Sequence, residues 1–427
     1  MRHHHTCCLF FVVLSFVGLA RGQEPPDNPR IAVEEALAEL DGKKDKPKPD
    51  KEKKPIEPPK KDIFSDVALM GGQFPTGFNP QMMGDFLGGF MRRTIVETGT
   101  QTITTRTTKK NLGAVGGIVT TTTTQTVPVT RTRTIVTPIF SSGAFKIGEN
   151  TSPRPQDRVF FMYNYFNRVS GPGNAPDPGL NFTSAVDTPG AIGGPGPAIS
   201  TTTNVFFPPK PRLTADLHRE VIGFEKTFLG GDASIELRIP LSQQQTNLEG
   251  LNLSNVGDLT IFTKFALIND RDTGDVFSVG LGVTAPTGPA TPTMDGSIHS
   301  TLLQPWFGYI RNAERFFVHG IHCIVVPSDS RDVTMLFNDV GVSYWLYRGG
   351  PDRFLTYIVP TAEVHVTTPL THRDAQGPAF VPDLAVLTGG LHVGFLRNTT
   401  LSVGVAVPVT GPRIYSAEYF LQLNRRF

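Results

Sequence analysis

Hydrophobic and polar side chains alternate with a period of two through most of the chain after Asp157. In residues 232–241, one strand face carries Ala233, Ile235, Leu237, Ile239 and Leu241, and the other carries Asp232, Ser234, Glu236 and Arg238. Residues 401–409 repeat the pattern, with Leu or Val at every odd position. Alternation of this kind predicts β-strands whose two faces meet different surroundings.

Twelve segments share this strand character and have the length that a membrane-spanning tilted strand needs, about 9–11 residues. They are approximately 158–168, 217–228, 232–241, 258–268, 276–287, 301–311, 315–326, 335–347, 353–367, 383–395, 399–409 and 415–427. Two architectures fit the alternation. It describes either half-buried strands over a soluble core or a membrane barrel with apolar side chains toward lipid.

The lengths of the connections favour the barrel. Long connections at 170–211, 242–257, 288–300 and 368–382 alternate with short or medium ones, and only 410–413 departs by being short. Long loops on one side and short turns on the other are typical of an up-and-down barrel inserted from the periplasm. We therefore predict an all-β fold, a twelve-stranded antiparallel transmembrane β-barrel over residues 157–427, preceded by a largely disordered N-terminal third. Both ends of the barrel are expected on the periplasmic, short-turn side.

The end of the chain carries a more specific signal. Tyr419, Leu421, Leu423 and the terminal Phe427 lie on one face of a strand, and only Arg425 interrupts the row. This row resembles the C-terminal signature of bacterial outer-membrane proteins. The resemblance implies two partners, the barrel-assembly machinery and outer-membrane lipid.

Three stretches carry a further resemblance. They are Ser278-Val-Gly-Leu-Gly-Val-Thr-Ala-Pro-Thr-Gly288, Gln304-Pro-Trp-Phe-Gly-Tyr309 and Asp157-Arg-Val-Phe-Phe-Met-Tyr-Asn-Tyr165. Together they resemble the phenol meta-pathway transporter-like family of barrels over roughly residues 157–427. The resemblance implies an outer-membrane barrel that takes part in transport and says little about the solute.

The N-terminus reads as a targeting and spacer region. Residues 1–22 have the apolar stretch and small-residue cleavage site of a secretory signal peptide. Residues 23–62 are expected to hold a short helix and a Lys/Pro-rich linker. We favour a plain spacer for 41–62, and contact with anionic cell-wall polymer is the alternative. After cleavage Cys323 would be the only cysteine left, so no internal disulfide is expected.

Residues 63–156 are rich first in Gly and Met and then in Thr, with 18 Thr among the 44 positions 94–137. We expect a low-complexity periplasmic segment. A β-ribbon, a plug and a stiff polar tether all remain open, because Thr suits strands but the composition offers little core.

The polar face of the predicted strands supplies candidate residues for the lumen. They are Arg158, Asn164, Arg168, Glu236, Arg238, Lys264, Glu363, His365, Glu418, Gln422, Asn424 and Arg426. Glu363 and His365 share a strand face and could act as an acid/base pair, but a polar lumen explains them more simply. His322 and Cys323 point to opposite faces of a strand, so we expect no metal site. No cofactor motif is present, and a net charge of +2 argues against a nucleic-acid partner.

The sequence thus predicts a non-enzymatic barrel in the bacterial outer membrane for passive passage of small or hydrophobic solutes. The alternative is a structural or adhesive barrel whose loop 170–211 binds a partner outside the cell. A soluble exported β-sandwich is a third hypothesis. Apolar rows that turned inward against a second sheet would overturn the membrane assignment.

Overall fold

The computed structural model describes residues 79–427 apart from 85–87, 111–116, 139–145, 190–196, 248–251, 294–295, 351–352, 374–376 and 378. The described residues all belong to one compact unit. The predicted signal peptide, short helix and linker lie outside the described residues. Among the described residues, no helix is long and apolar enough to cross a membrane.

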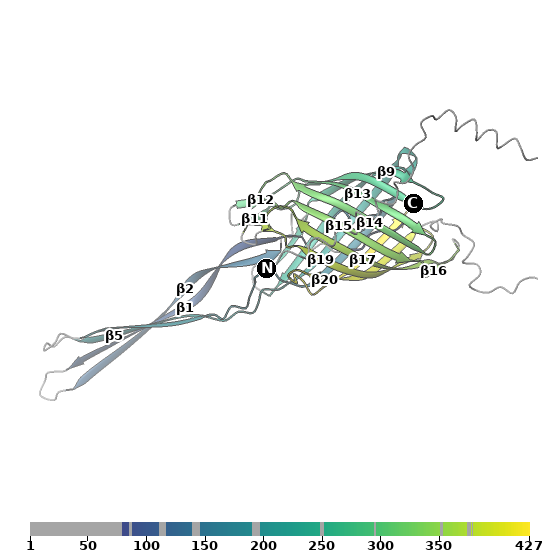
Figure 1. Cartoon of the computed structure of the whole chain (residues 1–427). Coiled ribbons are helices and arrows are strands. Elements are labelled where there is room, and N and C mark those ends of the chain that lie inside the picture. Colours follow the sequence, from purple (N-terminus) through teal and green to yellow (C-terminus); the bar gives the residue numbers. More distant parts are fainter. Residues whose placement is uncertain are drawn as a thin grey trace, which may run out of the picture. The chain divides into compact units, whose positions relative to one another are not determined.

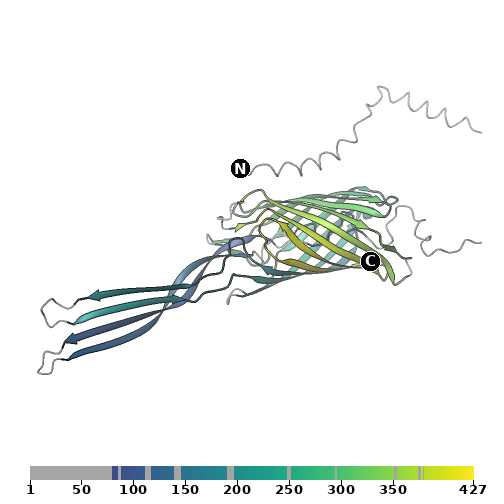
Figure 2. The ribbon, with the colours of Figure 1, turned by 60° about the horizontal axis from the view of Figure 1, so that its bottom comes forward.

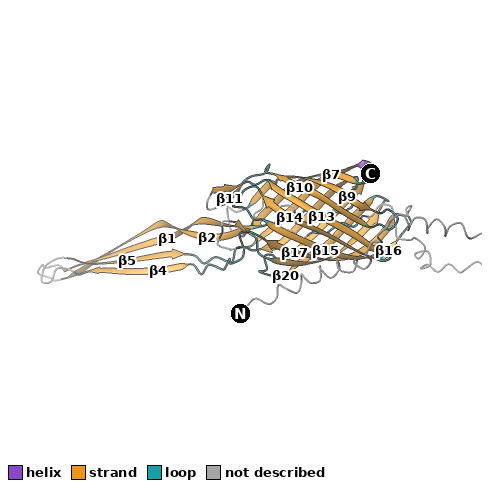
Figure 3. Ribbon diagram, turned by 45° about the horizontal axis from the view of Figure 1, so that its top comes forward, coloured by secondary structure: helices purple, strands orange, loops and turns teal. Residues whose placement is uncertain are grey.

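Twelve antiparallel strands form one closed barrel, with their slanted course visible in Figures 1 and 3. Each strand pairs with the next in the circle, and the pairs β15–β17 and β21–β3 complete it. In order around the barrel the strands are β3 (Arg158–Val169), β6 (Ala215–Phe228), β7 (Ala233–Thr246), β9 (Leu259–Asn269), β10 (Val276–Ala285), β13 (Leu302–Ala313), β14 (Phe316–Pro327), β15 (Met335–Tyr344), β17 (Leu355–Pro369), β19 (Leu384–Phe395), β20 (Thr399–Thr410) and β21 (Ala417–Arg426). The predicted twelve-stranded antiparallel barrel is confirmed, and each predicted segment overlaps one strand of the barrel.

The apolar rows of the strands face outward. Ile235, Leu237 and Ile239 of β7 are exposed, and the side chains between them are completely buried. Val403, Val405 and Val407 of β20 are exposed in the same way. This is the opposite of a sandwich, in which such rows would be buried between two sheets. The outer surface therefore suits lipid, and the polar faces line the lumen.

The connections of the barrel differ in length at its two ends, as expected. The shortest are the turns between β13 and β14 and between β19 and β20, and the 3-10 turn η3 (Leu229–Gly231) lies between β6 and β7. Gly230 and Gly231 both adopt positive φ in that turn, which glycine does without steric cost. The longer connections at the other end carry the short strands β8 (Leu253–Val256), β11 (Thr291–Thr293), β12 (Gly296–Ile298) and β18 (Ala379–Phe380). The two-residue β16 (Tyr347–Arg348) pairs with β17 near the opposite end.

A second sheet has five strands, the two-residue β18 and four longer ones, and we call it the Thr-rich sheet (Figure 2). β1 (Phe90–Lys110) and β2 (Ile118–Pro138) pair along all 21 residues, which corresponds to about 70 Å. β5 (Ala198–Phe207) pairs with the free side of β1, and β4 (Leu180–Thr188) pairs with β5. Threonine hydroxyls face each other across the strands, as in Thr102–Thr126 at 3.3 Å.

The Thr-rich sheet corrects two expectations. Residues 90–138 were expected to be largely disordered. They instead form a β-ribbon, which was one of the alternatives left open for this region. Residues 170–211 were expected to form a loop, and instead they contain β4 and β5. Thr and other β-branched residues dominate both regions, and β-branched side chains pack well on a pleated surface. Pairing with a neighbouring strand supplied the stability that the local sequence alone does not reveal.

Candidate functional site: the occupied lumen

Two stretches of chain lie inside the barrel, residues 79–84 and 146–157, which we call the first and second luminal segments. They are hydrogen-bonded to each other, since the Met82 N–H donates to the Thr151 carbonyl at 3.0 Å and the Asn150 N–H to the Met82 carbonyl at 2.9 Å. Met82, Met83 and Asn150 are at most 1% exposed. The lumen is therefore packed at this level and leaves no space for water beside these residues.

The luminal segments connect the two ends of the barrel. Near the short turns, Arg154 donates to the Asn269 side chain at 2.6 Å and to the Gly274 carbonyl at 2.9 Å, both next to the β9–β10 turn. At the other end, Phe90 stacks on Phe380 with ring centroids 6.1 Å apart, in the connection between β17 and β19. The chain thus runs through the lumen toward the long connections, forms β1 and β2 there, and returns.

This path places the Thr-rich sheet at the end of the barrel with the long connections. β1 pairs with β18 and with β5, which both belong to such connections. Met91 also packs with Ala379 of β18 and with Ile298 of β12, which belongs to a further long connection. We expected the whole of 63–156 on the short-turn side. That expectation is wrong for residues 90–138, because the N-terminal part of the described chain passes through the barrel before it forms the sheet.

A network of buried charges joins the barrel wall near the short-turn end. Arg158 on β3 lies 2.8 Å from Glu225 on β6 and 2.9 Å from Glu236 on β7. Lys264 on β9 lies 2.9 Å from Glu225 and 3.1 Å from Glu236. Arg238 pairs with Glu236 at 2.6 Å and donates to the Glu149 carbonyl at 2.9 Å. Three cations and two carboxylates therefore form one network with a positive charge in excess, and Arg238 of this network also holds the second luminal segment.

A second network holds both luminal segments to the opposite wall. Lys146 lies 2.7 Å from Asp339 on β15, and Asp339 lies 3.1 Å from His365 Nδ1 on β17. Glu363 lies 3.2 Å from His365 Nε2 and 3.3 Å from His319 Nε2. The Met83 N–H donates to the Glu363 carboxylate at 2.9 Å and 3.0 Å. We call this chain of groups the β14–β17 latch. It ties one wall to each luminal segment through completely buried polar groups.

Between these networks, Glu149 of the second luminal segment binds the wall of β3 and β6. Arg219 lies 2.6 Å from its carboxylate, and the Asn164 amide donates to it at 2.6 Å. Asn424 on β21 accepts from Arg158 at 2.8 Å and donates to Gln81 and Asn150. Beside these polar contacts, Met82 and Ile147 belong to an apolar cluster with wall side chains such as Trp306, and Met83 belongs to another with side chains such as Phe420. The segments therefore meet the wall through hydrogen bonds and through apolar packing.

The structure places most of the predicted lumen residues inside the barrel. Those that are at most 2% exposed are Arg158, Asn164, Glu236, Arg238, Lys264, Glu363, His365, Glu418, Gln422 and Asn424. Arg426 is half-buried at the short-turn rim, where its Nη2 atom is buried. The assembly-signal residues Tyr419, Leu423 and Phe427 are exposed on the outer face, with Leu421 between them.

Arg168 is the exception among the predicted lumen residues. It is exposed, and its backbone N–H donates to the Asp216 carboxylate at 2.8 Å. The pairing of β3 with β6 shifts register between Phe166 and Val169, and Arg168 has a φ of 54°. A bulge adds a residue to one strand and reverses the alternation beyond it. Strict period-two counting therefore assigned Arg168 to the wrong face.

Several luminal groups were not among the candidates. Lys146 and Glu149 lie in a segment without strand periodicity, so no pattern marked them. Glu225, Asp339 and His319 lie on strands and share a face with apolar side chains such as Val221, Phe337 and Ile321. A search for charged side chains on either face of each strand would have found these three.

The latch brings together titratable groups, but no metal-binding arrangement follows. Among the described residues, no group of three or more His, Cys, Asp or Glu is placed to hold a metal ion. His322 lies on the outer side, where its ring stacks on Phe307 with centroids 4.8 Å apart, and Cys323 is buried. These positions agree with the prediction that the two side chains point to opposite faces.

At the long-connection end, a compact ionic cluster fixes the base of the Thr-rich sheet. Glu97 on β1 lies 2.7 Å from Arg131 on β2 and 3.4 Å from Lys210, and Asp177 pairs with Arg131 and Arg133. Burial raises the pKa of Glu97, but the hydrogen bond from Arg131 and the charge of Lys210 outweigh it, so the net pKa is lowered. Asp177 has a lowered pKa for a similar balance of causes.

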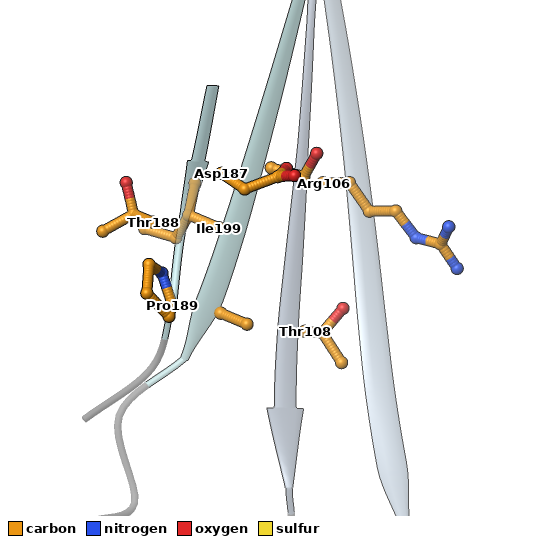
Figure 4. A pocket seen from close by; sticks show the side chains of 8 residues that line it. Arg106, Thr108, Asp187, Thr188, Pro189 and Ile199 are labelled. Atoms are coloured by element: carbon orange, nitrogen blue, oxygen red, sulfur yellow. The ribbon is translucent and has the colours of Figure 1, made fainter. Parts of the chain in front are cut away.

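Farther along the Thr-rich sheet, a shallow pocket of about 460 Å³ lies over β1, β4 and β5 (Figure 4). Arg106, Asp187, Pro189 and Ile199 are among its lining residues, and the Arg106 guanidinium points away from the Asp187 carboxylate. The groups do not converge on one point, so the pocket provides no defined chemistry.

Two channels are among the solved structures to which this chain is similar. No family model matches the chain, and no curated protein matches it. An outer membrane channel from Pseudomonas putida F1 is similar with a TM-score of 0.41 and 11% identity, over 64% of this chain and 96% of that chain. A mutant of TodX, a monoaromatic hydrocarbon channel, is similar with a TM-score of 0.31 and 8% identity, over 80% of this chain and 91% of that chain. The barrel fold described here rests on the hydrogen-bonded strands of this chain.

Proposed function

We propose that this protein is an outer-membrane β-barrel that lets small or hydrophobic solutes pass without catalysis. In this structure the luminal segments close the path. Passage requires these segments to shift from the wall while the barrel stays intact. The resemblance of residues 157–427 to the phenol meta-pathway transporter-like barrels fits the same class of activity.

The observation that carries the proposal is the polar contact between wall and luminal segments inside an apolar outer surface. Burying ion pairs such as Lys146–Asp339 contributes little net stability, because desolvation offsets much of the attraction. A purely structural barrel would gain more from an apolar filling. Polar walls, in contrast, can exchange their protein partners for water when the luminal segments move, and this leaves a hydrated path.

The orientation follows from the usual insertion of such barrels. We propose that the short turns, the segment before residue 79 and the C-terminus face the periplasm, and that the long connections and the Thr-rich sheet face outside. The outer row Tyr419, Leu421, Leu423 and Phe427 would bind the barrel-assembly machinery, and outer-membrane lipid would cover the exposed apolar rows. Residues 41–62 would then lie in the periplasm, within reach of cell-wall polymer.

Single-channel recording on the full chain in planar bilayers tests the proposal. We expect rare openings in the wild type and frequent openings when the latch is weakened. Membrane fractionation and heat-modifiable gel migration check that the protein is folded and inserted. A folded, inserted protein that stays silent both as wild type and with a weakened latch would contradict passage through the lumen.

A second candidate function is a structural or adhesive barrel that presents the Thr-rich sheet outside the cell. The supporting observation is that β4 is exposed on both faces and contains residues of the 170–211 region that was expected to bind a partner. Cells that display the full chain would then adhere to a surface or to other cells, and a chain lacking 180–207 would not. Adhesion without conductance would favour this alternative over transport.

A further inference from the structure

A pocket of about 420 Å³ lies at the short-turn end, where the second luminal segment leaves the lumen. The segment contributes residues 154–157, and the rest of the lining comes from β6, from turns between strands and from the end of β21. Three of the lining residues are arginines, Arg154, Arg271 and Arg426. The pocket thus joins a luminal segment to the rim of the barrel through a group of positive charges.

The lining offers hydrogen-bond donors that lack an acceptor. Arg154 Nε, Gln156 Nε2 and Arg426 Nη2 are buried and have no hydrogen-bond partner in the structure. Gln156 is 5% exposed, and its oxygen already accepts from Asn79 at 3.1 Å, so its amide nitrogen is directed elsewhere. Buried donors are normally satisfied, and these three belong to residues that line the same pocket, so an acceptor bound there is one way to satisfy them.

The negative charge that could satisfy these donors is already occupied. Asp157 is the acidic side chain of the lining, and it accepts from the Thr227 N–H at 2.7 Å and from the Thr227 hydroxyl at 2.8 Å. Its other oxygen lies 3.2 Å from the Lys226 ammonium. Among the described residues, neither Arg154 nor Arg426 takes part in a salt bridge, since their surroundings hold no free carboxylate side chain within ion-pair distance.

The arginines also repel one another. Burial lowers the pKa of Arg154 and the positive charge of Arg271 lowers it further, whereas the carboxylates of Asp270 and Asp275 act in the opposite direction without outweighing them. Arg271 is held near the pocket by its bond to the Gly230 carbonyl at 2.8 Å. A bound anion would relieve this repulsion and accept from the unsatisfied donors at once. A guanidinium is well suited to such an anion, because its planar fork matches the geometry of phosphate and carboxylate oxygens.

From this arrangement we propose that the pocket formed by Arg154, Gln156 and Arg426 binds one compact oxyanion, a phosphate or carboxylate group. The site is separate from the passage proposed above, because it lies at the rim and its occupancy is measurable in a closed barrel. Bound anion links the second luminal segment to β21. It therefore stabilises the arrangement of the segment seen here.

Isothermal titration calorimetry of the full chain in a neutral detergent, with inorganic phosphate as the probe, tests the site. We expect saturable binding in the wild type and at least tenfold weaker binding in Arg426→Gln, whose side chain makes no hydrogen bond that the variant would lose. Arg154→Gln tests whether the Arg154 guanidinium also contributes to phosphate binding. Arg425→Gln is the matched control, because Arg425 is the next residue of the same strand, is exposed, and donates to the Leu396 carbonyl and to Thr399 instead.

The source of the anion is distinguished in a second arm, in nanodiscs that contain either phosphatidylglycerol or phosphatidylcholine. Phosphatidylglycerol that competes with phosphate assigns the site to a lipid headgroup, and absence of competition assigns it to a soluble anion. Heat-modifiable migration establishes that each variant is folded. Phosphate binding that is absent in folded wild type, or that persists in Arg426→Gln as it does in Arg425→Gln, would overturn the proposal.

Discussion

Replacing Lys146 tests whether the latch keeps the lumen closed. The Lys146 ammonium lies 2.7 Å from Asp339, and both side chains are at most 2% exposed. In Lys146→Met, the ion pair is lost, and Asp339 keeps the His365 ring at 3.1 Å. Removing one partner of a buried ion pair costs about 3–5 kcal/mol, because the other charge is left uncompensated.

The expected change in the fraction of time spent open depends on which of the two states, closed or open, this cost destabilises. The uncompensated Asp339 destabilises the closed barrel, whereas water reaches it when the second luminal segment shifts. If about half of the cost, roughly 2 kcal/mol, separates the two states, the ratio of open to closed rises about 30-fold. Single-channel recording measures this ratio directly as the fraction of time spent open.

Two further variants separate the latch from general effects of charge. Lys226→Met removes a lysine whose side chain is 53% exposed and lies 3.2 Å from Asp157, and exposed pairs of this kind are worth about 0–1 kcal/mol. We expect no change in open fraction there. Lys146→Met combined with Asp339→Asn removes both charges and should bring the open fraction back toward wild type. A folded Lys146→Met protein that opens no more often than Lys226→Met would refute the reasoning.

Three other variants test the wall, the outer surface and the Thr-rich sheet. Glu236→Gln leaves Arg158, Arg238 and Lys264 without one of their two carboxylates and should destabilise the barrel by about 3–5 kcal/mol, measured as a lower urea midpoint than that of Glu220→Gln on the outer side. Leu237→Arg puts a charge on the exposed apolar row and should cost about 2–4 kcal/mol near the bilayer midplane, so folding yield into vesicles should fall well below that of Gln243→Arg nearer the strand end. Because the pKa values of Glu97 and Asp177 are lowered, their stabilisation is complete above about pH 4.5 and is lost as the pH falls through the lowered values. Hydrogen-exchange protection at the base of β1 and β2, measured relative to the intrinsic exchange rate at each pH, should therefore fall in acid, and Glu97→Gln, whose protection is low at every pH, should show a smaller acid effect.

The sequence predicted the barrel well because the outer surface imposes a strict period of two. Rows such as Ile235, Leu237 and Ile239 must all face lipid, so one slip of register would expose every polar neighbour. The lumen imposes a weaker rule. It accepts Val221 and Glu225 on the same face of β6, because a filled interior can supply either an apolar contact or a hydrogen-bond partner. Candidate lumen residues therefore came from polar rows, and mixed rows were missed.

The luminal segments could not be predicted from local sequence patterns, for a different reason. Residues 146–157 have few apolar side chains and no regular period, and their partners on the wall are distant in sequence, as with Lys146 and Asp339. Only the closed barrel brings these groups together. The same holds for Glu97, whose buried position depends on Arg131, Lys210 and Asp177.

The path of the chain constrains the order in which the barrel can assemble. Residues 90–138 form a hairpin of two 21-residue strands beyond the long-connection end, yet the chain on either side of it runs through the lumen. A paired hairpin with β5 attached is too wide to pass through a closed lumen already filled by side chains. The hairpin must therefore cross while the barrel is still open. The pairing of β21 with β3 joins the last strand to the first, and Asn424 on that seam bonds Gln81 and Asn150 of both luminal segments. Closure of this seam is thus the step that traps the segments. The hydrogen bonds between the luminal segments and the wall then stabilise the barrel that has closed with the segments inside.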